Sequence, residues 1–406
     1  MEWKEVRLGD VIDYKKGFAF KSSMYKSTGT YIVRVSDTTA NSVDVSLCNC
    51  ISPELAHQYT DYSLKTKDII IATVGSWPTN PASIVGKVVR VPESANNALL
   101  NQNAVRIRSN GIVDSDYIYY LLKEEHFSKY LVGTAQGSAN QASITLKDIF
   151  GYSFSAPSEI KDQRRIASIL SSLDRKIELN NKINADLEEM AQAIFKNWFV
   201  DFEPFKDGKF VNSELGMIPE GWKVVAFDNI LKVTTMKTGK EGIPEYSVTN
   251  TGIHPRDEKF TKNLSKSSAK NKLIRKGNLV FGMSREILNW GIMKEEVGGV
   301  SSAYNVYVVD ENIVNSIYLE CFIAQRMDYF ADLIKPASRE GQGVDKALLL
   351  KKIICIPPSE IMDVFLEKYD SIMHLAEIRK QESSHLSLLR DTLLPRLMSG
   401  ELEVPE

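Results

Sequence analysis

Two cysteines that lie close together, Cys48 and Cys50, are the residues of this chain most similar to metal ligands, and His57 follows them. A structural zinc site needs four such ligands, usually arranged as two pairs at short spacing. The other two cysteines, Cys321 and Cys355, are far apart and form no second pair. We therefore predict four reduced thiols and no metal ion.

Other residues that could do chemistry occur in fragments of catalytic motifs. Gly239-Lys240 lacks the upstream glycine of a phosphate-binding loop, and Gly341-Gln-Gly343 lacks the third glycine of a dinucleotide-binding turn. Asp257-Glu258-Lys259 has the residue types of a nuclease site but no second carboxylate partner, so a charged surface turn explains it better. The Asn/Asp-Pro-Pro-aromatic motif of amino-methyltransferases is missing, because Pro357-Pro358 is followed by serine. The sequence predicts a chain without catalytic residues.

A strongly basic segment, residues 256–276, is a candidate for binding a polyanion. It holds eight lysines and arginines against Asp257 and Glu258, a net charge of +6, whereas the whole chain has a net charge of −2. Phosphates are bound by such clusters because neutralising them releases counterions. A solvated loop or helix face would have the same composition, so both alternatives stay open. The lysines assigned to DNA contact in this segment are Lys259, Lys262, Lys266, Lys270 and Lys272.

Further candidates for DNA contact lie in polar loops and beside aromatic residues. Lys15 and Lys21 flank two phenylalanines, and Trp77 lies in a polar loop. Aromatic and basic side chains suit groove contacts, while glutamine and asparagine can read adenine edges. The alternative is that such aromatic residues simply pack inside the protein. The candidates of this kind are Lys15, Lys21, Trp77, Gln136, Asn140, Arg285, Gln342 and Lys346.

The element that must position these residues is a long stretch, residues 158–205, which Pro157 and Pro204 bracket. Its apolar residues recur every three or four positions, which predicts one helix with a single apolar seam. About 40 residues in a helix span about 60 Å. A rod of this length in mid-chain is expected to separate two globular parts rather than to belong to one.

The chain after residue 205 repeats the pattern of the chain before it. Gly221-Trp222-Lys223 restates the opening of the chain at an offset of 219, and Pro358-Ser359-Glu360 restates Pro157-Ser158-Glu159 at an offset of 201. Each half contains strand-like runs and an amphipathic helix, which in the first half covers Asp116–Leu131. We predict a mixed globule at 1–157, a long helix at 158–205, a second globule at 206–357 and a second long helix at 358–406.

Two helices with one apolar seam each can bury their seams against each other as an antiparallel pair. Both are polar near their midpoints, at Asn180 and at residues 381–385. A buried polar residue in a coiled coil fixes register at some loss of stability; simple exposure is the alternative. The predicted fold class is α+β, with two mixed α/β domains separated by two long antiparallel coiled-coil helices in an internal pseudo-two-fold repeat. The residues assigned to helix pairing are Ile166, Leu170, Leu173, Ile177, Asn180, Leu187, Ile372, Leu386 and Leu389.

Over essentially the whole chain, these features resemble the specificity subunit of type I restriction–modification systems. The most specific matches are residues 193–204, AIFKNWFVDFEP, and residues 393–402, LLPRLMSGEL, at the ends of the two long helices. The run Gln163-Arg-Arg-Ile166 is also similar to the family. Residues 363–366, Asp-Val-Phe-Leu, depart from the glutamine-containing start that the family usually has in its second helix.

The resemblance implies two target-recognition domains, each of which reads one half of a bipartite, asymmetric site in double-stranded DNA. It implies that the helices set the spacing of the half-sites and dock two modification (methyltransferase) subunits, which restriction/translocase subunits join. S-adenosylmethionine, ATP and Mg would be bound by those partners, and no cofactor by this chain. The residues assigned to partner docking or to a globule–helix junction are Phe195, Trp198, Phe199, Arg396 and Leu397.

Two other function classes compete with this hypothesis. A non-catalytic scaffold, whose two globules bind proteins and whose helices set a spacing, is the main alternative. An autonomous DNA-modifying enzyme is disfavoured by the missing motifs. No apolar run reaches membrane-spanning length, and the first residues lack the form of a signal peptide. We therefore expect a cytoplasmic protein with no membrane partner.

Overall fold

The computed structural model describes residues 1–77, 84–138, 141–256, 264, 267–284, 287–334 and 344–404. The chain divides into two compact units, one made of Met1–Asn180 with the chain from Gln381 onward, the other of Asn181–Lys380. Each unit therefore contains one globule and half of each long helix, α5 (Ile160–Phe199) and α9 (Ser359–Met398). No helix in the described ranges is long and apolar enough to cross a membrane.

The first unit is built on an antiparallel four-stranded sheet with the strand order β2-β9-β5-β7. The β5 strand, Ile-Ile-Ile-Ala, is buried throughout, as β-branched residues in a central strand are expected to be. Smaller sheets have the orders β1-β12, β4-β3-β8 and β10-β11-β6. The strands are β1 (Trp3–Arg7), β2 (Ile12–Lys16), β3 (Thr30–Val33), β4 (Asn49–Ile51), β5 (Ile69–Ala72), β6 (Val74–Gly75), β7 (Val88–Arg90), β8 (Leu99–Leu100), β9 (Ala104–Ser109), β10 (Gln136–Ser138), β11 (Gln141–Ser143) and β12 (Ser153–Pro157).

The helices of the first globule are α1 (Pro53–Ala56), α2 (Ser115–Lys123), α3 (Glu125–Thr134) and α4 (Leu146–Phe150). The single helix predicted over Asp116–Leu131 is therefore wrong. The chain forms α2 and α3 instead, because Glu124 between them is extended, with φ −67° and ψ 146°. Asp114 caps α2 by accepting hydrogen bonds from the N–H groups of Asp116 and Tyr117.

The second unit is also built on an antiparallel four-stranded sheet, with the order β16-β23-β20-β21. Pairs of strands β13-β14, β15-β24, β17-β18 and β19-β22 accompany it. The strands are β13 (Phe210–Ser213), β14 (Gly216–Pro219), β15 (Lys223–Ala226), β16 (Leu231–Thr234), β17 (Tyr246–Thr249), β18 (Gly252–Pro255), β19 (Lys272–Arg275), β20 (Leu279–Ser284), β21 (Ile287–Ile292), β22 (Val297–Val300), β23 (Asn305–Val309) and β24 (Ile353–Ile356). The shorter helices are α6 (Phe227–Ile230), α7 (Ser316–Gln325) and α8 (Lys346–Lys351).

The two four-stranded sheets have the same strand order when their strands are matched by position in the predicted repeat. Strands β2, β9, β5 and β7 of the first unit correspond to β16, β23, β20 and β21 of the second. In the first globule the first strand, β1, pairs antiparallel with the last, β12. In the second globule β15, which follows the restated Gly221-Trp222 opening, pairs in the same way with the last strand, β24. These matches support the internal repeat that the sequence predicts.

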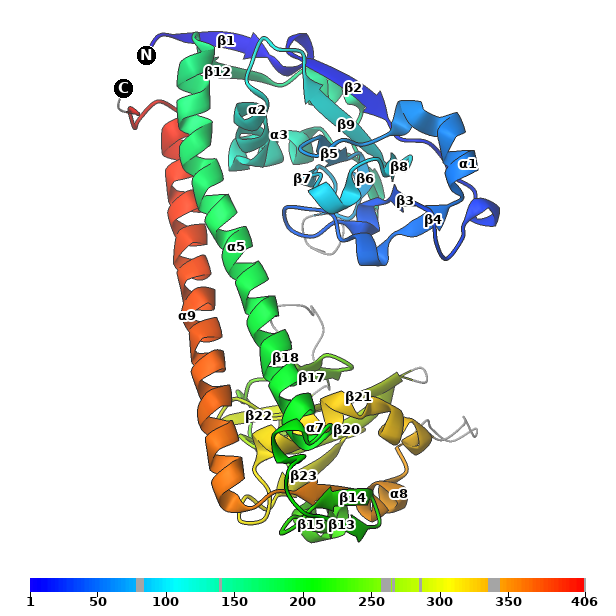
Figure 1. The fold of residues 1–406 in the computed structure, drawn as a ribbon. Coiled ribbons are helices and arrows are strands. Elements are labelled where there is room, and N and C mark those ends of the chain that lie inside the picture. Colours follow the sequence, from blue (N-terminus) through cyan, green and yellow to red (C-terminus); the bar gives the residue numbers. More distant parts are fainter. Residues whose placement is uncertain are drawn as a thin grey trace. The chain divides into compact units, whose positions relative to one another are not determined.

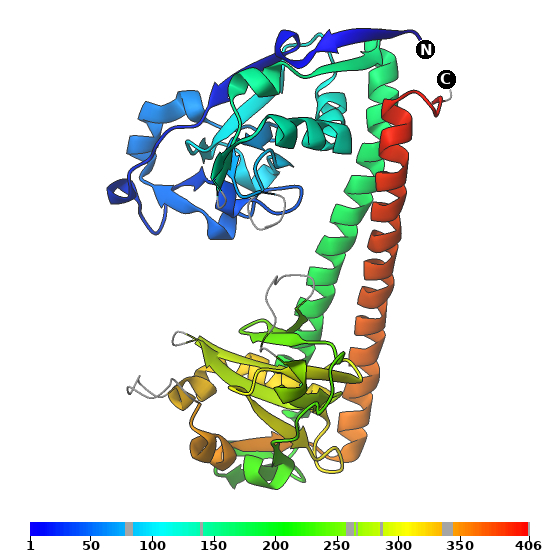
Figure 2. The ribbon, with the colours of Figure 1, turned by 180° about the vertical axis from the view of Figure 1, so that it is seen from behind.

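Within each unit, α5 and α9 lie side by side (Figure 1, and from behind in Figure 2). In the first unit, the start of α5 shares a hydrophobic core with the end of α9. In the second unit, the end of α5 shares a core with the start of α9. The two helices are therefore antiparallel in both units, and each anchors its globule through apolar side chains.

Both long helices end earlier than predicted. α5 stops at Phe199 because Phe202 adopts the left-handed conformation, with φ 54°, and its ring packs on Trp222 at a centroid distance of 5.2 Å. α9 stops before Gly400, whose φ of 76° favours glycine. A β-carbon at this glycine would lie 2.8 Å from the indole of Trp3, so the close approach also requires it.

Candidate nucleic-acid interface

The aromatic residues of the first candidate segment, after β2, are structural. Phe18 and Phe20 pack on Tyr59, with ring centroids 4.7 Å and 5.2 Å apart. They belong to a small hydrophobic cluster beside the β4-β3-β8 sheet. For these two phenylalanines the packing alternative is therefore correct.

The lysines of the same segment differ in exposure and in whether an acidic residue lies beside them. Lys15 lies 3.1 Å from the carboxylate of Asp61 and 4.8 Å from the ring centroid of Tyr62, so its charge already has local partners. Lys16 and Lys21 are exposed. Of the two lysines predicted here, Lys21 is thus the better placed for a phosphate.

Trp77 and Gln136, two candidates far apart in the sequence, meet in one small sheet. Strand β6 precedes Trp77, and Gln136 begins β10 of the same β10-β11-β6 sheet. The indole Nε1 of Trp77 donates a hydrogen bond of 2.8 Å to the backbone oxygen of Ser138. Gln136 is exposed, and Asn140 lies outside the described residues. The structure therefore brings two candidate loops together at one edge.

The Trp77 bond gives a testable expectation. The variant Trp77→Phe keeps an aromatic ring but removes the donor, which should cost the β10-β11 hairpin about 0.5–1.5 kcal/mol. Hydrogen exchange of the Gln136–Ser143 amides should become faster. Trp198→Phe, which changes a partly buried tryptophan of the second unit, is the matched control. Equal exchange of the hairpin in wild type and Trp77→Phe would show that the bond does not hold it.

Two glutamates that lie before the basic segment in the sequence, Glu241 and Glu245, anchor it in the second unit. Glu245 accepts hydrogen bonds from the Leu264 N–H at 2.9 Å and from the Asn271 Nδ2 at 2.7 Å. Glu241 accepts from the hydroxyls of Ser267 and Ser268, and these bonds lower the pKa of its carboxyl. Carboxylates thus hold the backbone of a segment rich in lysine.

The described lysines of this segment have different roles. Lys270 is exposed at the end of a short 3₁₀ turn. Lys272 is partly buried and donates to the backbone oxygen of Tyr304 at 2.6 Å. Burial lowers the pKa of Lys272, and the nearby charge of Lys346, which is exposed at the start of α8, lowers it further. The structure therefore brings Lys272 and Lys346 together. The candidates outside the described residues are Lys259, Lys262, Lys266, Arg285 and Gln342.

The residues assigned to helix pairing differ in burial. Ile166, Leu170 and Asn180 are fully buried. The residues of intermediate burial are Leu173, Ile177, Leu187, Ile372 and Leu386.

The assignment of Leu389 to this buried seam is wrong. Its side chain is 46% exposed, and the next residue, Arg390, contacts the α5 residue Asp174 instead, at 2.7 Å. A straight helix turns once every 3.6 residues rather than 3.5, so a seam counted in regular steps drifts around the helix.

The polar midpoint of the helix pair is buried. The Asn180 Nδ2 donates to the Glu382 Oε2 at 2.9 Å, and Lys176 lies 3.4 Å from the same carboxylate. Within the described part of the chain, the Oδ1 of Asn180 and the Oγ of Ser383 are buried without a hydrogen-bond partner. Of the two alternatives for Asn180, burial is therefore the one found, as a residue that fixes register requires.

The aromatic residues at the end of α5 form a junction rather than a docking surface. Phe195 is fully buried and Phe199 is 6% exposed, and both rings pack on Tyr318 of α7 and Phe365 of α9. Trp198 is only partly buried beside them. Phe195 and Phe199 are therefore not available to a partner.

The two α9 residues assigned to partner docking or to the junction, Arg396 and Leu397, differ in burial. Leu397 is 3% exposed and belongs to the core of the first unit. Arg396 lies 2.7 Å from the carboxylate of Glu401, and 44% of its side chain is exposed. Of the two, only Arg396 lies on the surface.

The four cysteines are free thiols, and Cys50, Cys321 and Cys355 are buried. Among the described residues, no group of three or more histidine, cysteine, aspartate or glutamate side chains could hold a metal ion. Burial raises the pKa of Cys48, Cys321 and Cys355 to about 12 in each case.

These pKa values predict slow alkylation. The reactive species is the thiolate, which becomes abundant only as the pH approaches the pKa. At pH 8 the folded chain should therefore react slowly at Cys321 and Cys355, and the rate should still be rising at pH 10. Mass spectrometry after timed iodoacetamide labelling measures this, with the unfolded chain as the control. Labelling of the folded chain at the unfolded rate would contradict the expectation.

Comparisons with known proteins agree with one another. Residues 1–189 match the family model described as the type I restriction modification DNA specificity domain. The type I restriction enzyme MjaIX specificity subunit of Methanocaldococcus jannaschii is 30% identical over 330 residues, covering 77% of this chain and 75% of that protein. The type I restriction enzyme HindI specificity subunit of Haemophilus influenzae is 22% identical over 471 residues, covering 99% of this chain and 100% of that protein.

A solved structure is also similar. The S subunit of a type I restriction–modification system from M. genitalium aligns with a TM-score of 0.50 and 14% sequence identity. The alignment covers 98% of this chain and 96% of that one. At this identity the likeness concerns the fold alone.

Proposed function

This chain belongs to the family of type I restriction enzyme specificity subunits, and from this premise we propose that it selects the DNA sequence on which a type I restriction–modification complex acts. Each globule is a target-recognition domain that reads one half of a bipartite, asymmetric site. The chain supplies recognition and no catalysis. Methyl transfer and ATP-dependent cleavage belong to partner subunits, which bind S-adenosylmethionine, ATP and Mg.

The observation that carries this proposal is the duplication of one sheet topology with different surface residues. Both units have the same order of strands in the four-stranded sheet, and in both the last strand pairs antiparallel with the strand that opens the repeat, β1 or β15. When residues 68–75 are aligned with residues 277–284, the residues that follow them differ: Ser76-Trp77 in the first unit and Arg285-Glu286 in the second. Two domains that share a fold but differ in their side chains are suited to recognising two different half-sites.

The helix pair is proposed to set the separation of the half-sites. α5 and α9 each contain 40 residues, a length of about 60 Å. This length is an upper bound on the separation, roughly one to two turns of duplex at about 34–36 Å per turn. The buried Asn180–Glu382 contact supports one register for the pair.

Sequence-directed methylation in the host tests the proposal. Methylated positions in the genome should form a two-part motif in wild-type cells, and that motif should disappear when this chain is deleted and return when it is restored. A protein-binding scaffold would leave the methylation pattern unchanged. Binding of the assembled complex to random DNA separates the same alternatives, since a scaffold gives no sequence preference.

A further inference from the structure

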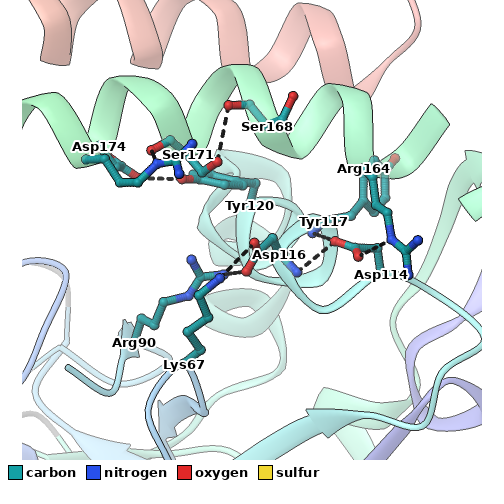
Figure 3. A network of polar contacts seen from close by, with 11 residues as sticks. Lys67, Arg90, Asp114, Asp116, Tyr117, Tyr120, Arg164, Ser168, Ser171 and Asp174 are labelled. Atoms are coloured by element: carbon teal, nitrogen blue, oxygen red, sulfur yellow. Dashed lines mark hydrogen bonds and ion pairs between the residues drawn. The ribbon is translucent and has the colours of Figure 1, made fainter. Parts of the chain in front are cut away.

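The first recognition domain is tied to α5 at two separate points, both through α2. Figure 3 shows the Tyr120–Asp174 contact and, at the start of α2, the ion pair of Asp114 with Arg164. At the start of α2, the Asp114 N–H donates to Gln163 Oε1 at 2.8 Å. Further along, the Tyr120 hydroxyl donates to the Asp174 Oδ2 at 2.6 Å. Gln163 and Asp174 are 11 residues apart, about 16 Å along the helix. Two attachments at this separation restrict the angle of α2 on the helix as well as its position.

The second attachment also includes α9. The Arg390 Nη1 lies 2.7 Å from the Asp174 Oδ1, so one carboxylate receives bonds from α2 and from α9. Tyr120 is 2% exposed, and the side chains of Arg390 and Asp174 are 18% and 30% exposed. Hydrogen bonds to a charged, partly buried partner are about twice as strong as neutral ones.

The same helix, α2, is also tied to the sheet. The Arg90 Nη2 at the end of β7 donates to the Asp116 Oδ1 at 2.9 Å, and Lys67 lies 3.3 Å from the other oxygen of the same carboxylate. The Arg90 guanidinium also stacks on Tyr119, 4.0 Å from the ring centroid. Figure 3 shows the two contacts of Asp116, with Arg90 and with Lys67. The orientation of the sheet therefore follows that of α2.

The second unit does not repeat the charged attachment. At the repeat offset of 201, Cys321 corresponds to Tyr120 and Leu375 corresponds to Asp174. Leu375 is 51% exposed and carries no polar group. The shared fold thus forms without this contact, which means that the contact in the first unit is not a general requirement for folding such a globule.

We propose that the Tyr120–Asp174–Arg390 contact holds the first recognition domain at one angle on the helix pair and thereby restricts the complex to one separation of half-sites. Asp174 is a positioning residue: it acts through α2 and α9 and contacts no DNA in this scheme. The inference rests on the proposed function. A domain free to change its angle would reach half-sites at neighbouring separations, although its own choice of bases would be the same.

The experiment uses the full chain assembled with its methyltransferase subunits. The substrate is a DNA library in which the separation of the two half-sites takes every value, in steps of one base pair, up to about two turns of duplex. Methylation is read by sequencing. In Tyr120→Phe and Asp174→Asn, discrimination against separations one base pair longer or shorter should fall by about tenfold, the factor that corresponds to one charge-assisted hydrogen bond. The half-site sequences should not change.

The matched control is Glu178→Gln, which removes the same charge from an exposed position one turn further along α5. It should keep the wild-type spacing profile, and thermal melting checks that each variant folds. Folded Tyr120→Phe and Asp174→Asn complexes with the wild-type profile would overturn the inference. So would an equal loss of methylation at every separation, which indicates only a structural role. If the wild-type complex methylates no two-part site, the proposed function itself fails, and this result does not depend on the variants.

Discussion

Replacement of Phe195 by alanine is expected to lower the free energy of unfolding of the second unit by about 3–5 kcal/mol, the range for a buried phenylalanine. Phe195 is fully buried, and its ring lies 5.0–5.7 Å from the rings of Phe199, Tyr318 and Phe365. These residues come from α5, α7 and α9. The substitution therefore leaves a cavity where the globule meets both long helices.

Hydrogen exchange can assign the effect to one unit, because protection reports local as well as global opening. Amides of β20 and β23 should lose protection in Phe195→Ala, whereas those of β5 and β9 in the first unit should keep theirs. Met190→Ala is the matched control on the same helix, since Met190 is 51% exposed; it should change stability by no more than about 0.5 kcal/mol. A similar small effect of both substitutions would contradict the junction role.

Neutralising the basic segment is expected to have the largest effect on DNA binding. Replacing Lys262, Lys266 and Lys270 with glutamine should weaken binding to every sequence and should reduce the slope of log affinity against log salt by about 0.9 for each lysine that contacts a phosphate. Lys270 is exposed, while Lys262 and Lys266 lie outside the described residues. Titrations at several salt concentrations, on specific and random DNA, measure both quantities.

A second triple variant controls for the change of net charge. Lys206, Lys232 and Lys294 also belong to the second unit, and each lies within 3.5 Å of a carboxylate oxygen. Replacing these three with glutamine removes the same charge from residues that already have acidic partners, so the salt slope should change less. Equal slopes for the two triple variants would show that the basic segment makes no special contact with phosphate.

The features predicted well from the sequence are those that depend on local periodicity or on comparison of the chain with itself. The long helix of the first half is present because apolar residues every three or four positions require a helix to gather on one face. The helix ends earlier than the pattern predicts, because Phe202 adopts a left-handed conformation and packs on Trp222. The local sequence pattern does not indicate this contact, since Trp222 lies 20 residues further along the chain. The predicted helix Asp116–Leu131 failed for a similar reason, the extended backbone at Glu124.

Individual site residues were harder to predict, because the same residue types serve packing and binding. Phe18 and Phe20 have the composition of a groove contact but pack on Tyr59. Lys272 lies in the most basic segment, yet it bonds to a backbone oxygen. The exposure of a side chain distinguishes a residue that packs from one that can bind. Exposure depends on which distant elements of the chain cover that side chain. The sequence shows Arg390 as a charged residue beside a predicted seam position, but it does not show that Asp174 is its partner.

By itself, the sequence determined the number of globules and long helices, the repeat that relates the two halves, and the family to which the chain is similar. These follow from periodicity and self-similarity, which are properties of the chain in one dimension. Only the tertiary structure decided that Phe195 is a core residue, that Asn180 is buried against Glu382, and that one carboxylate, Asp174, joins α2 to α9. The physical reason is that burial and hydrogen bonding depend on residues up to 216 positions away in the chain.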